Sequence, residues 1–445
     1  MRRADEVFWT RVFLFGASCV AGLLIARKRT LRRFHLHILS SKEHDYGRYF
    51  GMDIGGTLSK LVYFQPTTSA TMPRSVNTTR GAEGSLAAIE AYVLALRSTD
   101  RARTTHRDER LELSIASLGG TLHFLSFPSA KMDDITDVVR HRFFHRFIKR
   151  IPCTGGGAFK YSRMFEEKLG IELEKEDEME CLIRGLNFVL RFAPDECYTF
   201  TDVQLDTHGL GTATKKILPT PPRDELYPFL LVNIGSGVSI LKVKSEQSFE
   251  RVSGTSLGGG TFWGLCKTLS KLETFDEAMD ATLRGESNAL DMTVGDIYGR
   301  GGYEQFDLKS STVASSFGKV GTKPEPRSGV QDEDVARALL FMLTQNIGQL
   351  AYLNARRVET PRIYFCGNFL RRNEIASRQL AYAIDYWSKS AMQAQFFHHE
   401  GFFGALGCVL GHWGDDRKPN ANASAPSSSG SASASSAVSA SAIAA

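Results

Sequence analysis

The stretch FGMDIGGTLSK, residues 50–60, decides how this chain folds. It reads as an apolar strand, a turn rich in glycine and a second strand, and the stretch VNIGSGVS at residues 232–239 repeats the pattern. Glycine lets a backbone approach a phosphate closely and turn its N–H groups toward it. One such loop is a weak signal. Two of them suggest a duplicated scaffold that holds a nucleoside triphosphate between its halves.

The composition is that of a globular protein with an unevenly charged chain. A length of 445 residues allows two or three domains and a sizeable core. The net charge is +5, but residues 1–50 carry ten Lys and Arg against four Asp and Glu, so residues 51–445 sum to −1. A near-neutral body gives no case for nucleic-acid binding. The seven cysteines show no Cys-x-x-Cys and no zinc spacing, which favours reduced thiols in a cytosol-like compartment.

Both ends of the chain differ from the body. Residues 12–26 carry no charge but fall short of the roughly 20 residues that span a bilayer, and only residues 8–26 come close. Three interpretations stay open for the leader: a membrane anchor that leaves the body in the cytosol, a mitochondrial targeting segment, and an adventitious extension. At the other end, 20 of the last 25 residues are Ala or Ser, which predicts disorder.

The body alternates between strand-like and helix-like segments, and strand hairpins followed by helices occur twice. We therefore predict an α/β fold with a leader at 1–47, an N-terminal lobe at 48–228, a C-terminal lobe at 229–415 and a disordered tail at 416–445. The expected strands are 50–53, 58–64, 111–115, 122–127, 229–233, 240–243 and 363–366. The expected helices are 83–96, 264–272, 275–284, 332–356 and 373–395.

Phosphoryl transfer needs a phosphate cradle, a metal that neutralises charge, and a group that orients or deprotonates the acceptor hydroxyl. Asp53 precedes the first glycine turn, where its carboxylate can hold Mg²⁺ directly or through water. Gly55, Gly56 and Thr57 would offer backbone N–H groups to the phosphates, and Lys60 follows as a point charge. An ordinary tight hairpin with a buried aspartate remains the alternative. The Walker A pattern is absent.

Two further segments supply a cation and acidic candidates. RVSGTSLGGGTF, residues 251–262, combines Arg251 with small hydroxyl residues, and Gly258–Gly260 are expected to begin a helix that presents free N–H groups to an anion. CTGGGA at 153–158 is a similar turn before a helix. The acidic run at 172–180 contains several possible bases, and the unaided pattern leaves Asp177 and Glu178 both open.

Taken together, these motifs resemble the eukaryotic-type (type II) pantothenate kinases. The matching motifs follow one another in the same order as in the family. They lie within about residues 48–412 and include neither tail. Its motifs are FGMDIGGTL at 50–58, TGGGA at 154–158, DE at 177–178, NIGSGVSI at 233–240, SGTSLGGGTF at 253–262, VASSFG at 313–318, GNFLR at 367–371, YAIDYWSK at 382–389 and EGFFGA at 400–405.

The resemblance implies a two-lobed actin-like, sugar-kinase-like ATPase fold with duplicated hairpin phosphate loops. It implies a homodimer that uses ATP and Mg²⁺ to convert pantothenate to 4′-phosphopantothenate, the first step of coenzyme A synthesis. We expect the protein in the cytoplasm, with the leader leaving a membrane or mitochondrial location open. It also implies feedback inhibition by acetyl-CoA or another acyl-CoA, bound across the ATP and pantothenate sites. A sugar kinase on the same fold and a non-catalytic acyl-CoA sensor are the rival hypotheses.

The resemblance also assigns roles. Glu178 corresponds to the catalytic base, and Ser236, Ser239 and Arg251 correspond to contacts with the substrate or the acyl-CoA inhibitor. The residues matching the phosphate end of the ATP site are Asp53, Gly55, Gly56, Thr57, Lys60, Gly235 and Gly237.

A few positions stand apart from these assignments. Tyr386 and Trp387 correspond to a wall of the pantetheine pocket on the dimer side. Ser59 and Gln349 depart from the family pattern.

Overall fold

The computed structural model describes residues 49–66, 106–115, 118, 120–141, 145, 148–204, 212–325, 328–371 and 373–415. The predicted leader, the predicted tail and the helix expected at 83–96 lie outside these residues. Within the described ranges, no helix combines the length and the apolarity that crossing a membrane requires.

Seven strands form the first sheet, in the order β3-β5-β2-β1-β6-β7 with β4 paired to β5. They are β1 (Phe50–Ile54), β2 (Leu58–Pro66), β3 (His106–Arg107), β4 (Leu113–Ile115), β5 (Gly120–Pro128), β6 (Arg150–Thr154) and β7 (Glu172–Lys175). Strands β1 and β2 are the predicted hairpin, and β1 is apolar and buried along most of its length because both faces of the sheet are covered.

Seven strands also form the second sheet, in the order β12-β11-β10-β15-β16-β8-β9. They are β8 (Cys197–Gln204), β9 (Thr212–Leu218), β10 (Phe229–Ile234), β11 (Val238–Ser245), β12 (Ser248–Thr255), β15 (Ile363–Cys366) and β16 (Ala394–Phe397). A separate pair of short strands consists of β13 (Met292–Thr293) and β14 (Val313–Ser315).

The two sheets share one topology, which confirms the predicted duplication. In the first, β1 pairs antiparallel with β2, β2 pairs antiparallel with β5, and β6 and β7 add in parallel on the other side of β1. In the second, β10, β11 and β12 take the places of β1, β2 and β5, while β15 and β16 take those of β6 and β7. The two glycine turns therefore occupy equivalent places in the two sheets.

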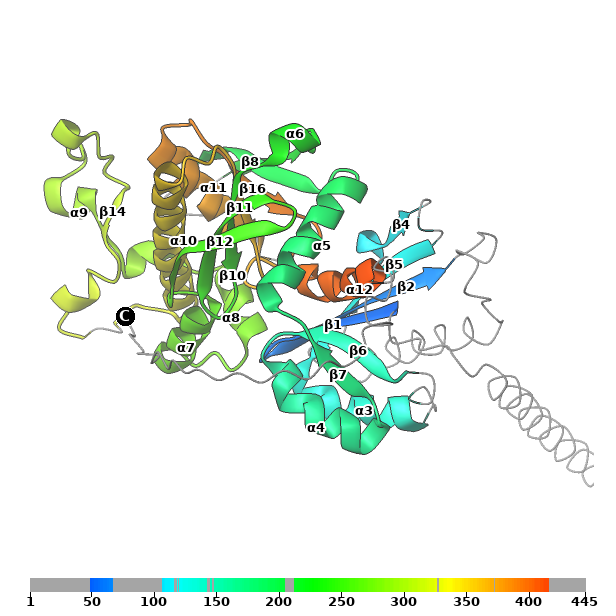
Figure 1. Cartoon of the computed structure of the whole chain (residues 1–445). Helices are drawn as coiled ribbons and strands as arrows, with labels where there is room; N and C mark the ends of the chain where they lie inside the picture. Colours follow the sequence, from blue (N-terminus) through cyan, green and yellow to red (C-terminus); the bar gives the residue numbers. More distant parts are fainter. Residues whose placement is uncertain are drawn as a thin grey trace, which may run out of the picture.

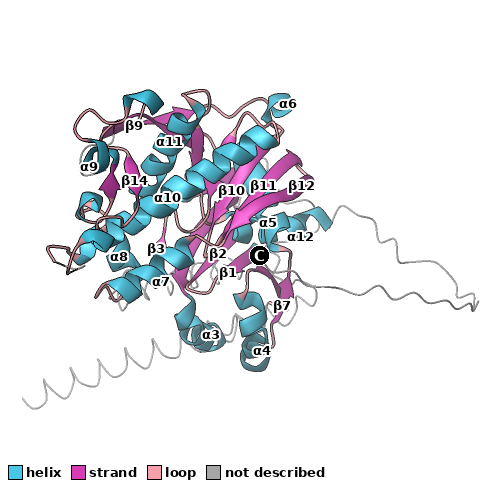
Figure 2. Ribbon diagram, turned by 90° about the vertical axis from the view of Figure 1, so that its left-hand side faces the viewer, coloured by secondary structure: helices cyan, strands magenta, loops and turns pink. Residues whose placement is uncertain are grey.

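The helices form an outer layer and an inner layer. Their bounds are α3 (Met132–His141), α4 (Gly157–Leu169), α5 (Glu178–Phe192), α6 (Arg223–Leu226), α7 (Gly259–Leu269), α8 (Phe275–Ala281), α9 (Val294–Tyr298), α10 (Asp332–Arg357), α11 (Glu374–Ser388) and α12 (Phe403–Asp415). Figure 1 shows α5 and α12 between the two sheets, whereas Figure 2 shows α3 and α4 outside the first sheet and α10 along the second. One apolar core joins α5 and α12 to the inner faces of both sheets, and another lies under α7, α10 and α11.

Some predicted element bounds were wrong. The helix expected to reach residue 395 ends at Ser388, because Lys389 and Ser390 both adopt left-handed backbone conformations, with φ of 53° and 63°. The apolar residues that follow then form β16 instead. Leu111 belongs to a short 3₁₀ helix, so the strand predicted from residue 111 begins only at Leu113.

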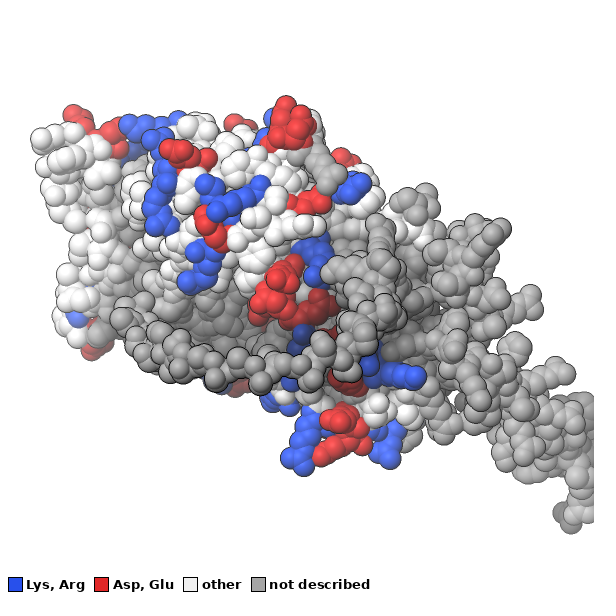
Figure 3. All heavy atoms as spheres, viewed as in Figure 1, with Lys and Arg blue, Asp and Glu red and all other residues white. Residues whose placement is uncertain are grey.

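The lobe boundary predicted at residues 228/229 falls where the strand pattern of the first sheet begins again with β10. Some elements on each side of this boundary nevertheless pack with the sheet of the other lobe. Strands β8 and β9 precede residue 229 in the chain, yet β8 pairs with β16 in the second sheet. Helix α12 follows β16 but packs against β1 in the first sheet. On the face shown in Figure 3, acidic and basic side chains are interspersed, and acidic ones gather over the lower end of α5.

Candidate active site

One cavity of about 1070 Å³ lies between the two sheets and is lined by both glycine turns. Asp177, the alternative base, is not among its lining residues. The residues assigned to catalysis, to contact with the substrate or acyl-CoA inhibitor, or to the ATP phosphates all line it. These residues are Asp53, Gly55, Gly56, Thr57, Lys60, Glu178, Gly235, Ser236, Gly237, Ser239 and Arg251.

A buried ion pair lies at the first turn. Asp53 and Lys60 are directly opposite each other in the β1–β2 hairpin, and Lys60 Nζ donates to Asp53 Oδ2 at 3.0 Å. The side chain of Lys60 is only 8% exposed, and that of Asp53 is 18% exposed. A buried ammonium group needs such a partner, since removing it from water unpaired is costly. Lys60 therefore holds the carboxylate of Asp53 at the mouth of the turn.

Hydrogen bonds fix the shape of the first turn. The N–H of Gly55 donates to the carbonyl of Leu58 at 3.2 Å, and Ser129 Oγ donates to the carbonyl of Gly55 at 2.7 Å. Ser59, which departs from the family pattern, is buried with its Oγ 2.8 Å from Ser129 Oγ. The prediction that Gly55 offers its N–H to a phosphate was therefore wrong, because that N–H closes the turn. The N–H groups of Gly56 and Thr57 are the ones left to meet a phosphate.

Gly155 lets the end of β6 approach Asp53. Its φ of +84° is disfavoured for any residue with a side chain, and a Cβ there would lie 2.9 Å from Asp53 Oδ1 and 2.8 Å from the carbonyl oxygen of Ile54. The turn expected before a helix at 153–158 is thus confirmed, with α4 starting at Gly157.

The second turn is braced by the start of α7. The N–H groups of Gly259 and Gly260 donate to the carbonyls of Gly235 and Ser236 at 2.8 and 2.9 Å, and the N–H of Gly258 donates to Ser256. The predicted helix start at Gly258–Gly260 is confirmed, but the expectation that these N–H groups are free for an anion was wrong. The N–H groups of Gly259 and Gly260 bind carbonyls of a hairpin more than 20 residues earlier, a contact that no local pattern reveals, and that of Gly258 binds within its own loop.

The structure separates Asp177 from Glu178. Asp177 is the N-cap of α5, and its Oδ1 accepts hydrogen bonds from the N–H groups of Met179 and Glu180, each at 2.9 Å. Glu178, the first residue of the helix, lines the cavity. Desolvation between the cavity walls, followed by the negative charge of Asp53, raises the pKa of the Glu178 carboxyl, against an opposing effect of Lys60.

A cation lies on the second-lobe side of the cavity. Arg251 is exposed on β12, and its guanidinium lies over Gly254, where a Cβ would overlap it. Within the described part of the chain, no ion pair joins Arg251 to a carboxylate. Ser236 and Ser239 line the same cavity with their hydroxyl groups. Together these three side chains present one positive charge and two hydroxyls to a ligand.

Sequence reasoning missed the apolar part of the cavity wall. Trp263, Phe275 and Phe369 line it, on α7, on α8 and after β15. Trp263 and Phe275 lie on helices, where aromatic residues are indistinguishable from core residues in a sequence. Phe369 belongs to the motif GNFLR at 367–371, which was quoted without a role in the cavity wall. Tyr386 and Trp387 are exposed on α11 and do not line this cavity, so the pocket wall that the resemblance assigns to them stays a prediction.

The donor set fits Mg²⁺ only together with a phosphate ligand. In the described ranges, no group of three His, Cys, Asp or Glu side chains forms a site for a metal ion. Mg²⁺ is usually held by one or two carboxylates, waters and the phosphates of a substrate, rather than by an all-protein cage. Asp53, whose Oδ1 faces Gly155 while Oδ2 binds Lys60, supplies such a carboxylate.

Comparison with known proteins gives a consistent result. The model of the family described as Fumble matches residues 49–411. Pantothenate kinase 1 of Arabidopsis thaliana is 40% identical over 82% of this chain and 85% of its own length. Pantothenate kinase of Schizosaccharomyces pombe is 37% identical over 81% of both chains. Pantothenate kinase 2 of Arabidopsis thaliana is 39% identical over 84% of this chain, but the match spans only 40% of that relative's length.

Proposed function

The chain belongs to the Fumble family, and from that premise we propose that it transfers the γ-phosphoryl group of ATP to the hydroxyl of pantothenate. The product would be 4′-phosphopantothenate, a precursor of coenzyme A. The observation that carries the proposal is the meeting of Glu178, the Asp53–Lys60 pair and Arg251 in one cavity that both glycine turns line.

Glu178 is the general base of the proposed reaction. A carboxylate with a raised pKa accepts a proton from a hydroxyl more readily than an ordinary one, and the walls of the cavity supply that shift. Its place at the first residue of α5, with Asp53 close enough to act on its charge, puts the base beside the phosphate end of the site. The proton of the pantothenate hydroxyl passes to Glu178 as its oxygen forms a bond to the γ-phosphorus of ATP, while the bond from that phosphorus to the β–γ bridging oxygen breaks and ADP leaves.

Asp53 and the first turn hold the phosphate end. Asp53 would hold Mg²⁺, which when bound neutralises phosphate charge during transfer. Lys60 keeps Asp53 in place through their hydrogen bond, and the N–H groups of Gly56 and Thr57 bind phosphate oxygens. The second turn, through Gly235 and Gly237, approaches the same nucleotide from the other lobe.

The second-lobe residues support an anionic acceptor. Pantothenate carries a carboxylate at the end of the molecule away from its reactive hydroxyl. Arg251 is the cation suited to that carboxylate, because it lines the cavity without a carboxylate partner among the described residues. Ser236 and Ser239 would bind the polar groups of the ligand. A neutral hexose would leave Arg251 unmatched, which favours pantothenate over a sugar.

The resemblance supports finer proposals as well. Acetyl-CoA or another acyl-CoA would inhibit by occupying the cavity in place of ATP and pantothenate, with Ser236, Ser239 and Arg251 among its contacts. The active form would be a homodimer in the cytoplasm, with the leader deciding any attachment to a membrane or entry into mitochondria. Calorimetric titration with acetyl-CoA, size measurement in solution and imaging with and without residues 1–42 test these three proposals.

A substrate panel tests the central proposal. The purified chain is incubated with ATP, Mg²⁺ and either pantothenate or one of several hexoses and amino sugars, and phosphorylated products are measured. We expect turnover of pantothenate alone. Glu178→Ala should abolish turnover while leaving ATP binding intact. A hexose product would favour the sugar kinase, and binding of acyl-CoA without any turnover would favour a sensor.

A further inference from the structure

Helices α5 and α12 cross in direct backbone contact between the lobes. A Cβ at Gly185 of α5 would overlap the carbonyl oxygen of Phe403, and a Cβ at Gly407 of α12 would overlap that of Cys181. Only glycine permits this approach. The crossing therefore sets the position of α5, the helix that begins with Glu178, relative to α12.

The same helix α12 also contacts the strand that carries Asp53. A Cβ at Gly51 would overlap the carbonyl oxygen of Ala405, and a Cβ at Gly404 would lie 3.3 Å from Asp53 Cγ. Helix α12 thus touches β1 on one side and α5 on the other (Figure 1). Helix α12 therefore contributes to the separation of the two active-site carboxylates, Asp53 and Glu178.

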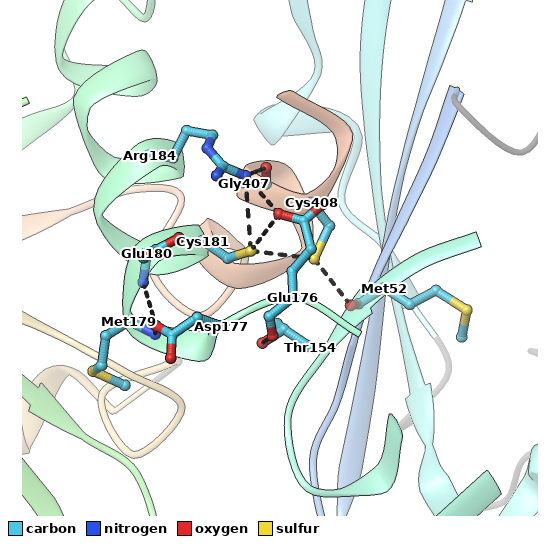
Figure 4. A network of polar contacts seen from close by, with 10 residues as sticks. All are labelled: Met52, Thr154, Glu176, Asp177, Met179, Glu180, Cys181, Arg184, Gly407 and Cys408. Carbon is cyan, nitrogen blue, oxygen red and sulfur yellow. Dashed lines mark hydrogen bonds and ion pairs between the residues drawn. The ribbon is translucent and has the colours of Figure 1, made fainter. Parts of the chain in front are cut away.

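A charged bridge locks the crossing, as Figure 4 shows. Arg184 Nη1 donates to Glu176 Oε2 at 2.7 Å and to the carbonyl of Gly407 at 2.9 Å. Glu176 lies two residues before Glu178, and Arg184 lies on the second turn of α5. A Cβ at Gly411 would lie 2.8 Å from Glu176 Oε2, so a glycine of α12 also makes room for the bridge.

The backbone of Glu176 is tied to the first sheet. Its N–H donates to the carbonyl of Cys153 at 2.8 Å, and its carbonyl accepts from Thr154 Oγ1 at 3.1 Å. Two buried thiols extend the contacts: Cys181 Sγ lies 3.3 Å from Glu176 Oε2, and Cys408 Sγ lies 3.6 Å from the carbonyl oxygen of Met52. The segment before Glu178 is thereby joined to β6, to α12 and to the residue before Asp53.

We propose that Arg184 is a positioning residue for the phosphoryl transfer. Through its contacts with Glu176 and Gly407, it holds Glu178 at a fixed position relative to Asp53. Arg184 itself does not line the cavity. The kinetic test of this proposal rests on the proposed function, because it measures kcat for the phosphorylation of pantothenate. Misplacing a catalytic group by about 1 Å costs on the order of 100-fold in rate. Loss of the bridge should therefore lower kcat far more than it alters ligand binding.

The test compares Arg184→Met with two other variants of α5. Arg184→Met should lower kcat about 30- to 100-fold, with KM for ATP and for pantothenate changed less than about threefold. Arg184→Lys keeps a cation beside Glu176 and should recover most of the activity. Arg191→Met is the matched control, because Arg191 is an exposed arginine in the last turn of the same helix. Unchanged kcat in Arg184→Met overturns the proposal.

A double-mutant cycle separates positioning from stability. Glu176→Gln alone should lower kcat, and adding Arg184→Met to it should cost little more, since both changes break one bridge. If the losses of kcat from the two single variants multiply fully in the double variant, the two residues do not act through one bridge. If Arg184→Met fails to fold, Arg184→Lys and Glu176→Gln carry the test, and a kcat loss that only tracks a lowered Tm would assign the bridge to stability.

A spectroscopic measurement keeps the inference separate from the proposed function. The Glu178 carboxyl carbon, assigned in ¹³C-glutamate-labelled protein by its loss in Glu178→Gln, is titrated by NMR. The charged groups that act on it are Asp53, Lys60 and Asp177. Arg184→Met should shift the pKa of Glu178 and Arg191→Met should not, even if the chain turned over no pantothenate. An unshifted pKa together with unchanged kcat rejects the positioning role.

Discussion

The two glycine turns share a backbone and differ in charge. In the first lobe, Asp53 lies opposite Lys60 in the β1–β2 hairpin, whereas in the second Asn233 lies opposite Ser239 in the β10–β11 hairpin. Strands β6 and β15 pair in parallel with β1 and β10, the first strands of the two hairpins. Each is followed by a glycine with positive φ, Gly155 or Gly367, that packs against the carbonyl of the isoleucine after Asp53 or Asn233. One duplicated scaffold therefore carries a charged residue pair at its first turn and a neutral pair at its second.

This difference indicates how the halves divide the chemistry. A carboxylate paired with an ammonium group suits the metal and phosphate end of a kinase site. An amide and a hydroxyl suit hydrogen bonding to a ligand without adding charge. Asn233 has a weaker contact than Asp53, because the thiol Sγ of Cys366 lies 3.7 Å from its Oδ1. The duplicated turns line the two sides of the cavity, and the different side chains at equivalent positions give those turns different charges.

Exchanging the side chains at the equivalent positions gives the largest expected effect. Asp53→Asn should lower kcat about 100- to 1000-fold, because one removed electrostatic contact at a reacting centre costs this much. Asn233→Asp should change kcat less than about tenfold and act mainly on the KM for ATP, since the proposed magnesium ligand Asp53 belongs to the other lobe. Steady-state kinetics on both variants checks the asymmetry, and equal losses would contradict it.

Removing the cation of the second lobe should weaken binding more than catalysis. Arg251→Ala should raise the dissociation constants of pantothenate and acetyl-CoA about 10- to 100-fold, the usual cost of losing a hydrogen bond to a charged group. Lys244→Ala is the matched control, because Lys244 is an exposed cation at the far end of the same hairpin. Calorimetry measures both ligands, and unchanged affinities would remove Arg251 from the site.

The pH profile should respond to charges of the first lobe only. Glu178 must be deprotonated to act as a base, so kcat/KM should fall as the pH drops through its raised pKa, which lies above that of an ordinary glutamate. Lys60→Met removes a charge that lowers this pKa and should move the acidic limb to higher pH. Lys244→Met, on β11, should leave the acidic limb at the same pH. A shift of the limb in that variant would contradict the claim that only first-lobe charges set this pH dependence.

Replacing the equivalent glycines should give the smallest effect, on stability. Gly155→Ala and Gly367→Ala should each lower the free energy of unfolding by about 1–3 kcal/mol, since both residues have positive φ and face a backbone carbonyl. Gly264→Ala is the control, because this exposed helical glycine has open space around it and should gain up to about 1 kcal/mol. Urea unfolding measures all three, and a neutral Gly155→Ala would argue against the strained turn.

The hairpins were predictable because their signals are local. Apolar runs on either side of Gly55-Gly56 and of Gly235 indicate two strands and a turn, and the structure confirms both hairpins. The placement of Glu178 was only half predictable. Spacing leaves Asp177 and Glu178 equivalent, and the N-cap hydrogen bonds of Asp177 settle which one faces the cavity.

Contacts between distant segments were not predictable. The carbonyls of Gly235 and Ser236 occupy the N–H groups at the start of α7, and Arg184 reaches Gly407 more than 200 residues away. Similarly, nothing in the pattern of residues 197–218 indicates that these strands join the second sheet. Such pairings depend on tertiary packing, which a single sequence does not encode in its local periodicity.

The most direct measurement follows radiolabelled pantothenate with ATP and Mg²⁺ in the presence of the purified full chain, its Glu178→Gln variant or its Arg191→Met control. The account predicts labelled 4′-phosphopantothenate from the full chain and the control, and a rate about 10²- to 10⁴-fold lower from Glu178→Gln, as expected for loss of a general base. Failure of the full chain to phosphorylate pantothenate, or undiminished turnover by Glu178→Gln, would contradict it.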